Sequence, residues 1–299
     1  MKELSPSSII AFVGLGQMGI PMSRNLIAAG YTVRGADLAA PARAALEAEG
    51  GTAFASPAEA AEGADGLVTM LPDGATVRDA LLGEVGAAAA LAKGTVVVDM
   101  SSSAPTDTLS LGRDIEAMGL GLVDAPVSGG VRKAVSGTLA IMAGGRPEAV
   151  AAARPMLEVL GERVFETGIL GSGHAMKSIN NFVSGAGLAA ALEAMLLGKA
   201  FGLDPALMVD VLNASTGRNN STENKLKQFV LNDSFAAGFG LALMAKDIGI
   251  ADALAREMGL DLPTLHTMAA LWADAREALP KGADHTEMFR YLADKAATR

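Results

Sequence analysis

The 299-residue chain contains no cysteine and only three histidines. Without cysteine it has no disulfide framework, no thiolate nucleophile and no cysteine-based zinc site. The histidines, at positions 174, 266 and 285, do not pair at metal-ligand spacing, so we expect no metal site. Aromatic residues are also scarce, at 4% of the chain. These absences remove much of the usual catalytic repertoire and leave other side chains, or a cofactor, to carry any chemistry.

Positive charge is in short supply as well. Lys and Arg number 24 against 33 Asp and Glu, a formal net charge of −9, which disfavours nucleic acid or an anionic membrane as a partner. No signal-peptide cleavage pattern follows the apolar stretch near the N-terminus. The longest apolar stretch, Phe182–Leu197, is rich in alanine and glycine and includes Glu193, whereas a membrane span needs about 20 strongly apolar residues. We therefore expect a soluble, cytoplasmic protein.

What the chain does have is apolar residues, at 50%, and 35 glycines. Its length suggests about two domains, at roughly 100–200 residues each. In the first half, short β-branched runs alternate with helix-like stretches. We expect strands at Ile9–Val13, Thr32–Ala36, Gly66–Met70, Thr95–Asp99, Gly121–Asp124, Leu139–Ala143 and Arg163–Glu166, with helices between them. This alternation predicts an α/β domain with a doubly wound parallel sheet covered by helices on both faces.

The pattern changes after Gly171, where no further strand is evident. Ser172–Phe201 reads as one long helix that is apolar on nearly every side, and shorter helices follow it. We place the domains at residues 1–168 and 169–299, the second being all-helical with the long helix at the junction. A helix that is apolar all round must be buried by neighbours. We therefore expect a second subunit to cover part of it, in a homodimer or homotetramer.

A glycine motif follows the first expected strand. Gly14-Leu15-Gly16-Gln17-Met18-Gly19 has the GxGxxG spacing and opens a helix. In dinucleotide-binding folds the first glycine permits a tight turn, the second lets the backbone approach a pyrophosphate, and the third allows close helix–strand packing. The helix N-terminus then offers free N–H groups to the phosphates. The strand before the motif and the helix after it favour a dinucleotide site over an ordinary glycine turn.

Asp37 ends the second expected strand, near the spacing of the acid that binds the adenosine ribose. A carboxylate there would repel a 2′-phosphate, so NAD is favoured over NADP. Arg34 and Arg43 lie close by in the sequence and keep NADP open. The alternative is that Asp37 is a solvated turn residue.

Further ligand-binding candidates follow other expected strands, because doubly wound sheets bind ligands at the carboxyl ends of their strands. Met70, Leu71 and Pro72 follow one strand, and Ser101 and Ser102 follow another. The serines suit a nicotinamide amide or a substrate. The alternative is helix capping, with Ser103 or Ala104 before Pro105. The later segment Ser128-Gly129-Gly130 offers a hydroxyl and backbone N–H groups, which suit a small carboxylate or belong to a flexible loop.

Lys177 and Asn181 lie near the start of the long helix, four residues apart and therefore on one face. Polar groups on an otherwise apolar helix are costly unless they face something polar. That partner is either a structural ion pair or a ligand. Gly173, one turn earlier, is expected to leave room for a ligand.

Taken together, these motifs resemble the β-hydroxyacid dehydrogenase family. The resemblance covers nearly the whole chain and rests on GLGQMGIPMSRNL (Gly14–Leu26), DAPVSGG (Asp124–Gly130), GTLAIMAGG (Gly137–Gly145), GSGHAMKSINN (Gly171–Asn181) and KDIGIA (Lys246–Ala251). It implies a Rossmann-type N-terminal domain, a helical C-terminal domain, a homo-oligomer and NAD(P)-dependent oxidation of a small hydroxy acid. Candidate substrates are of the 3-hydroxyisobutyrate, tartronate semialdehyde/glycerate or threonate type.

Carried over position by position, the resemblance makes Lys177 the catalytic acid/base. It assigns the substrate to Ser128, Gly129, Gly130 and Asn181, and it places Lys246 near the cofactor. The sequence departs from the family at Arg132 and Lys133, where relatives often have small residues; we expect these two cations near the anion-binding cleft. An imine reductase-like NADPH enzyme and a non-catalytic cofactor-binding scaffold are the alternatives, and the retained lysine counts against both.

Overall fold

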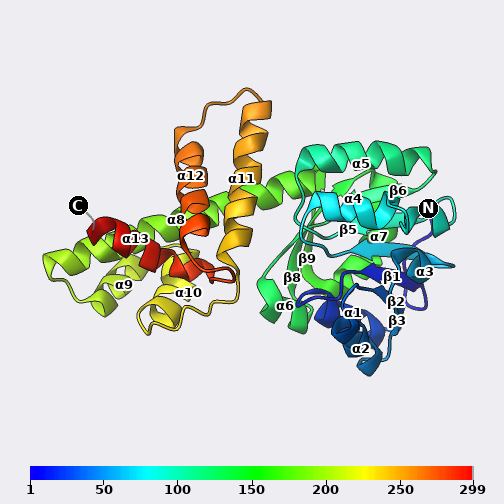
Figure 1. Cartoon of the computed structure of the whole chain (residues 1–299), viewed down its shortest axis with the longest axis horizontal. Coiled ribbons are helices and arrows are strands. Elements are labelled where there is room, and N and C mark those ends of the chain that lie inside the picture. Colours follow the sequence, from blue (N-terminus) through cyan, green and yellow to red (C-terminus); the bar gives the residue numbers. More distant parts are fainter. Residues whose placement is uncertain (298–299) are drawn as a thin grey trace. The chain divides into compact units, whose positions relative to one another are not determined.

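The computed structural model describes residues 1–297, and the chain separates into two compact units (Figure 1). The first unit runs from Met1 to Lys177, and the second begins at Ser178. The division expected after residue 168 stays a prediction. The two units are described in turn.

The first unit is built on one mixed sheet. Its strands are β1 (Ile9–Val13), β2 (Thr32–Ala36), β3 (Thr52–Phe54), β4 (Gly66–Thr69), β5 (Val96–Asp99), β6 (Gly121–Asp124), β7 (Val127–Ser128), β8 (Leu139–Gly145) and β9 (Gly161–Gly168). The strand order is β3-β2-β1-β4-β5-β6-β8-β7, and β9 pairs with β8. All pairs from β3 to β6 are parallel. The carboxyl ends of β1, β2, β4, β5 and β6 therefore meet along one edge.

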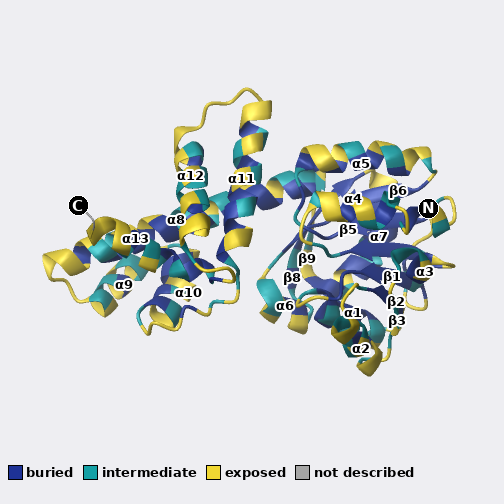
Figure 2. Ribbon diagram, viewed as in Figure 1, coloured by how far each residue is buried: buried dark blue, intermediate teal, exposed yellow. Residues whose placement is uncertain are grey.

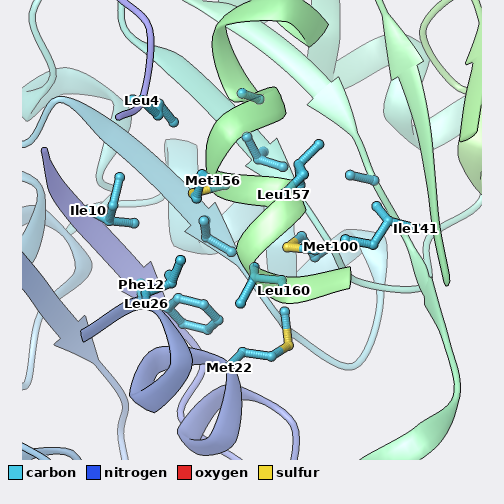
Figure 3. Packing of buried hydrophobic residues seen from close by; sticks show 14 of the residues in the cluster. Leu4, Ile10, Phe12, Met22, Leu26, Met100, Ile141, Met156, Leu157 and Leu160 are labelled. Carbon is cyan, nitrogen blue, oxygen red and sulfur yellow. The ribbon is translucent and has the colours of Figure 1, made fainter. Parts of the chain in front are cut away.

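Helices cover both faces of this sheet, as the sequence predicts. They are α1 (Gly19–Ala28), α2 (Ala40–Ala48), α3 (Pro57–Ala61), α4 (Gly74–Leu82), α5 (Pro105–Ala117), α6 (Gly130–Ser136) and α7 (Pro147–Leu160), with a 3₁₀ turn, η1 (Ala88–Ala90). One apolar core joins Phe12 to Met22 of α1 and Leu157 of α7 (Figure 3). The other joins Val97 to Val77 of α4 and Leu111 of α5. The parallel strands are buried on both faces, which explains their continuous apolar sequences.

The sheet differs from the expected all-parallel arrangement at β8. This strand runs antiparallel to both β6 and β7. The physical reason is that Val127 and Ser128 pair with Ile141 and Ala140, so the chain from β7 to β8 returns as a hairpin closed by α6. The segment between Asp124 and Leu139 is thus not a crossover. The chain regains parallel pairing through α7, which leads from β8 to β9.

The second unit is helical. It contains the part of α8 (Ser172–Phe201) that follows Lys177, then α9 (Pro205–Ala214), α10 (Asn220–Asn224), a π-helical turn η2 (Leu226–Val230), α11 (Leu241–Glu257), α12 (Pro263–Ala278), the 3₁₀ turn η3 (His285–Glu287) and α13 (Met288–Ala297). Leu192 of α8 packs with Ile248 of α11 and Met288 of α13 in one core. Trp272 of α12, the only tryptophan of the chain, is fully buried in that core.

The bounds of α8 match the expected helix. Among residues 1–297 it is the one helix long and apolar enough to cross a membrane, and 44% of its most apolar window is buried inside the protein. A core helix of a soluble protein meets the same criterion. Exposed and buried residues alternate along it (Figure 2).

One expected helix is divided. From its sequence, the stretch Glu223–Leu231 reads as a single helix, one of the shorter helices after Phe201, but α10 ends at Asn224 and the π-turn begins at Leu226. Lys225 between them has φ −130° and ψ −43°, which is outside the helical region. Helix α10 starts two residues after Arg218 because Asn219 caps it, in a capping box with Thr222.

Candidate active site

The glycine motif forms the turn between β1 and α1. Gly14 has φ +101°, and a Cβ added there would lie 2.3 Å from the Met70 carbonyl oxygen. A Cβ on Gly19 would lie 1.9 Å from the Gly14 carbonyl oxygen. Both positions therefore require glycine for the turn and for close packing, as expected from the spacing.

Gly16 differs from its neighbours in the motif. A Cβ built on it would meet no heavy atom within 4 Å among the described residues. Gly16 and Gln17 are exposed, and the side chain of Met18, the residue at the start of α1, makes no capping hydrogen bond. Open space beside an uncapped helix N-terminus fits a pyrophosphate, because the first-turn N–H groups and the helix dipole both favour an anion. This chain's residues therefore fit the dinucleotide that the motif implies.

Asp37 stands at the end of β2 and contacts the glycine loop. Its Oδ2 accepts a hydrogen bond from the backbone N–H of Leu15 at 2.8 Å, and its Oδ1 accepts one from Ala39 at 2.8 Å. Asp37 is half-buried. It is thus not a solvated turn residue, since its carboxylate joins two loops at the edge where the strands end.

Arg34 and Arg43, the two arginines that could favour NADP, both donate hydrogen bonds to backbone carbonyls. Arg43 donates from Nη1 to the carbonyls of Asp37 and Leu38. Arg34 donates to the carbonyls of Glu59 and Glu62, and its guanidinium lies 4.7 Å from the centre of the Phe54 ring.

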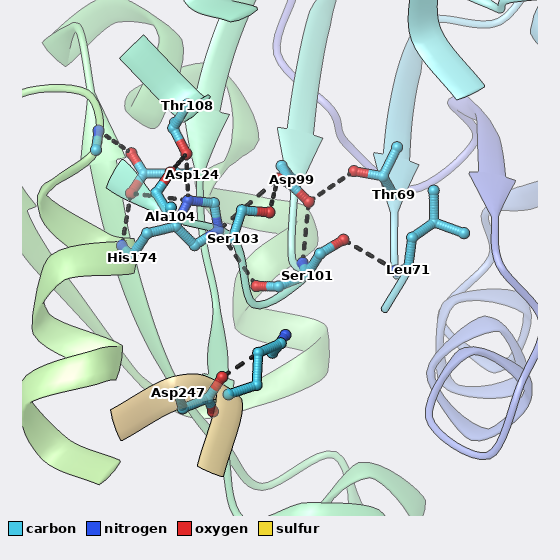
Figure 4. Close-up of polar contacts among 12 residues, drawn as sticks. Thr69, Leu71, Asp99, Ser101, Ser103, Ala104, Thr108, Asp124, His174 and Asp247 are labelled. Atoms are coloured by element: carbon cyan, nitrogen blue, oxygen red, sulfur yellow. Dashed lines mark hydrogen bonds and ion pairs between the residues drawn. The ribbon is translucent and has the colours of Figure 1, made fainter. Parts of the chain in front are cut away.

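The loops after β4 and β5 are joined by a serine (Figure 4). The Oγ of Ser101 accepts a hydrogen bond of 2.9 Å from the backbone N–H of Leu71, and its own N–H donates to Asp99 at 3.0 Å. Ser101 is 2% exposed. Its hydroxyl oxygen therefore fixes the backbone of Leu71, between Met70 and Pro72, and a role of Ser101 as a ligand donor stays a prediction. Ser102 beside it is half-buried.

Lys177 lies in the first turns of α8, and its side chain is directed to the β7 segment. Its Nζ donates a hydrogen bond of 2.7 Å to the carbonyl of Val127, although Lys177 is only 8% exposed. Val127 immediately precedes Ser128, Gly129 and Gly130. The structure thus brings the lysine next to the Ser-Gly-Gly segment, although Lys177 and Val127 are 50 residues apart in the sequence. Gly129 and Gly130 have φ +134° and +65°, values that favour glycine.

The start of α8 is held by a buried carboxylate that sequence reasoning missed. Asp124, at the end of β6, accepts from the backbone N–H of Gly171 at 2.7 Å and of His174 at 2.8 Å. The imidazole of His174 lies between Asp124 and Asp99 (Figure 4). Burial raises the pKa of the Asp124 carboxyl to about 6, against opposing effects of nearby His174 and of the backbone donors.

Gly173 does not leave room for a ligand, contrary to the expectation. A Cβ there would lie 2.2 Å from the Met142 carbonyl oxygen and 2.8 Å from that of Asp124. The glycine is needed because α8 packs directly on the backbone of β6 and β8. Arg132 and Lys133 are both exposed on α6. The Lys133 side chain lies against Gly129, because a Cβ added to Gly129 would be 2.5 Å from the Lys133 Cδ.

The helical unit has its own polar cluster around Asp247 of α11. Asn181 donates from Nδ2 to Asp247 Oδ2 at 2.6 Å, and the Nζ of Lys246 lies 3.6 Å from Asp247 Oδ1. Asn181 and Asp247 are 5% and 2% exposed. Two residues expected at the site, Asn181 and Lys246, therefore meet at one carboxylate. Asp247 lies within the KDIGIA motif, which could have indicated it.

A pocket of about 510 Å³ lies beside the glycine loop. Its walls are mostly apolar and come from α1, α2 and α6, with Gly16, Gln17 and Arg24 at the loop side. None of the expected substrate-binding residues lines it.

Comparisons with known proteins agree with these features. Residues 9–168 match the model described as the NAD binding domain of 6-phosphogluconate dehydrogenase, and residues 171–292 match that described as NAD-binding of NADP-dependent 3-hydroxyisobutyrate dehydrogenase. The chain is 38% identical to 2-(hydroxymethyl)glutarate dehydrogenase of Eubacterium barkeri over 85% of this chain and 84% of the relative. It is 36% identical to an NAD-dependent L-serine dehydrogenase of Pseudomonas aeruginosa, over 85% and 87%.

Solved structures give the same result. The 3-hydroxyisobutyrate dehydrogenase of Mycobacterium tuberculosis with L-serine is 35% identical, with a TM-score of 0.88, over 96% of this chain and 99% of that one. An imine reductase of Streptomyces aurantiacus is 20% identical, with a TM-score of 0.63, over 95% of this chain and 99% of that one, and shares the fold alone. The chain belongs to the β-hydroxyacid dehydrogenase family. It is an oxidoreductase with a Rossmann-type NAD-binding domain followed by a helical domain.

Proposed function

We propose that the protein interconverts a small hydroxy acid and its carbonyl product with NAD, and that Lys177 is the general acid/base. The observation that carries this proposal is the contact of the buried Lys177 ammonium with the Val127 carbonyl, one residue before Ser128. The substrate class is of the 3-hydroxyisobutyrate, tartronate semialdehyde/glycerate or threonate type, and the relatives named for 2-(hydroxymethyl)glutarate and L-serine fit the same class of small acids.

We assign the substrate carboxylate to the Ser128 hydroxyl and the backbone N–H groups of Gly129 and Gly130, with Ser102 and Asn181 as further donors. Both glycines have positive φ, a backbone conformation of the kind in which successive N–H groups form an anion-binding concavity. Because the net charge of −9 is repulsive at long range, recognition of an anion must come from such local donors.

For the cofactor, the candidate residues are the glycine loop (Gly14, Leu15, Gly16, Gln17, Met18, Gly19), Asp37, Met70, Leu71, Pro72, Ser101 and Lys246. NAD is favoured over NADP because the Asp37 carboxylate would repel a 2′-phosphate. The commitment of Arg34 and Arg43 to backbone carbonyls supports this preference.

In the mechanism, the nicotinamide ring, when bound, supplies the acceptor or donor of the hydride. Lys177 takes the hydroxyl proton at Nζ during oxidation and returns it to the carbonyl oxygen during reduction. The Val127 carbonyl orients the Nζ through its hydrogen bond. Positioned proton transfer of this kind contributes about 10²–10⁴-fold to the rate.

The test is Lys177→Ala, assayed for NADH formation with L-threonate, 3-hydroxyisobutyrate, D-glycerate and L-serine. We expect kcat to fall at least about 100-fold while the dissociation constant for NADH changes little. Lys199→Ala, an exposed lysine on the same helix, is the matched control. Unchanged kcat in Lys177→Ala would remove Lys177 from the mechanism. If the protein reduces imines with NADPH, or turns over none of the acids, an imine reductase or a scaffold replaces the proposed function.

We further propose a homodimer or homotetramer formed through α8 and α9. Exposed large apolar residues continue from the end of α8 into α9, with Leu197 at 74%, Phe201 at 83%, Leu207 at 60% and Val211 at 55% exposed. Only Val209 of α9 is buried (Figure 2). A second copy is the expected occupant, because one patch can pair with itself about a two-fold axis. The double variant Phe201→Glu/Leu207→Glu should be a monomer, with half the wild-type mass by light scattering if the protein is a dimer and a quarter if it is a tetramer. A wild-type protein that is itself a monomer would overturn the proposal.

A further inference from the structure

His174 connects three elements of the first unit. Its side chain is fully buried. The Nδ1 lies 2.7 Å from the Thr108 hydroxyl of α5, and the Nε2 lies 3.2 Å from the Ser101 carbonyl in the loop after β5. Its backbone N–H donates to Asp124 at the end of β6. The mechanism proposed above uses none of these contacts.

The hydrogen-bonding partners determine where the ring carries protons. The Ser101 carbonyl can only accept, so Nε2 must carry a hydrogen. The Thr108 hydroxyl has one hydrogen, which goes either to Nδ1 or to the Ala104 carbonyl at 3.1 Å. In the second case Nδ1 also donates, and the resulting imidazolium lies 3.7 Å from Asp99 and 3.8 Å from Asp124. In either state the ring orientation is fixed at both nitrogens.

His174 precedes Lys177 by three residues, so the two side chains are neighbours on the surface of α8. Lys177 is held at its tip by Val127, and the helix turn from which it extends is held by Asp124 and His174. Ser101, at the other end of the imidazole, positions Leu71 through its hydroxyl. The ring therefore lies between the loop expected to hold the nicotinamide and the turn that carries the lysine.

We infer that His174 is a positioning residue, which fixes the loop after β5 relative to the first turn of α8 and thereby sets the distance between the nicotinamide subsite and the Lys177 amine. This inference rests on the proposed function, since it gives Lys177 the proton-transfer role. Misplacement of a reacting group by about 1 Å can cost about 100-fold in rate. A loss in kcat without a comparable loss in cofactor binding is the expected signature.

The experiment compares His174→Gln and His174→Leu in the full-length protein. Glutamine can keep a donor to the Ser101 carbonyl, and leucine cannot. We expect His174→Leu to lower kcat about 100-fold and His174→Gln to recover at least about tenfold of that loss, with the NADH dissociation constant within about threefold of wild type. The apparent pKa of the proton acceptor, measured from the kcat–pH profile, should also change in His174→Leu.

Thr108→Val tests the same role of His174 in case His174→Leu does not fold. It removes only the hydroxyl at Nδ1, and Thr106→Val, exposed on the same helix, is its control. We expect a loss in kcat with Thr108→Val and none with Thr106→Val. Wild-type kcat and pH profile in both His174 variants or in Thr108→Val would overturn the inference while Lys177→Ala is still inactive. If Lys177→Ala is itself active, the proposed function fails first, whatever His174 does.

Discussion

The carboxylate of Asp37 accepts a hydrogen bond of 2.8 Å from the backbone N–H of Leu15, which lies between the first two glycines of the loop. One side chain at the end of β2 thus holds the loop after β1 in shape. We propose that this acid has two effects: it supports the backbone that approaches the pyrophosphate, and it excludes a 2′-phosphate.

Replacing Asp37 with Asn should test both effects. We expect about tenfold weaker NAD binding, because one backbone N–H loses its carboxylate acceptor, and a clear fall in the preference for NAD over NADP. Kinetic constants with both cofactors measure the change, and Glu47→Gln, exposed on α2, is the control. If the wild-type enzyme already uses NADP equally well, the role given to Asp37 is wrong.

Alanine at the second and third motif glycines should have opposite consequences. At Gly19 the new Cβ would overlap the Gly14 carbonyl, so we expect a loss of about 1–3 kcal/mol in the free energy of unfolding, or no folded protein. At Gly16 the space is open, so thermal stability should stay within about 2 °C of wild type while NAD binding weakens. Thermal unfolding with and without NADH compares them. Unchanged NAD binding in Gly16→Ala would place the pyrophosphate elsewhere.

Asp247 is predicted to support substrate binding through Asn181. Asp247→Ala leaves the Asn181 amide and the Lys246 ammonium without this carboxylate, so both should reorient. We expect KM for the hydroxy acid to rise about tenfold, with a smaller change in kcat, because a hydrogen bond to a charged group contributes about 1.5–3 kcal/mol. Asp274→Ala, an exposed acid on α12, should leave KM unchanged. Equal KM values in both variants would contradict the prediction.

Lys225 should make the unfolding free energy depend on pH in the alkaline range. Burial lowers the pKa of its ammonium to about 8, although Asp284 opposes the shift, whereas the unfolded chain has the usual value of 10.5. Between these values the unfolded state binds more protons, so stability increases as pH rises from about 8 to about 10.5, and the full cost of the buried charge is present below pH 8.

Lys225→Met removes this cost. We expect the variant to be more stable than wild type at pH 7 by about 1–3 kcal/mol, with a smaller difference at pH 10. Urea unfolding at both pH values measures it. Lys227→Met, at an exposed lysine paired with Asp210, should show neither effect. A destabilised Lys225→Met at pH 7 would mean that the ammonium contributes more through its charge than its burial costs.

Much of the fold follows from apolar periodicity, and the exceptions have physical reasons. The short strands β3 and β7 contain three and two residues, too few for a periodic pattern. Helix α6 begins at Gly130 after another glycine, a combination typical of loops. Lys225 would be read from the sequence as lying on a solvated face, but it is half-buried at the residue where the helix breaks. Backbone breaks of this kind depend on tertiary packing, which local propensity does not report.

The candidate site could be predicted only in part. The glycine loop, Asp37 and Lys177 were identifiable because their spacing within one segment is characteristic. The cluster of Asp99, Asp124 and His174 was not, because its contacts join His174 to residues 50 and 75 positions earlier, at the ends of different strands. Asp124 and His174 both stand in the quoted motifs, but a motif does not show that one caps the helix on which the other lies.

The burial of Trp272 has a spectroscopic consequence. As the only indole of the chain, it gives the protein's tryptophan emission a single origin, in the core formed by α8, α11, α12 and α13. A red shift of that emission during denaturation therefore reports the opening of the helical unit alone, whereas far-UV circular dichroism reports the helices and strands of both units. Midpoints that differ between the two signals would show that the units do not unfold in one two-state transition.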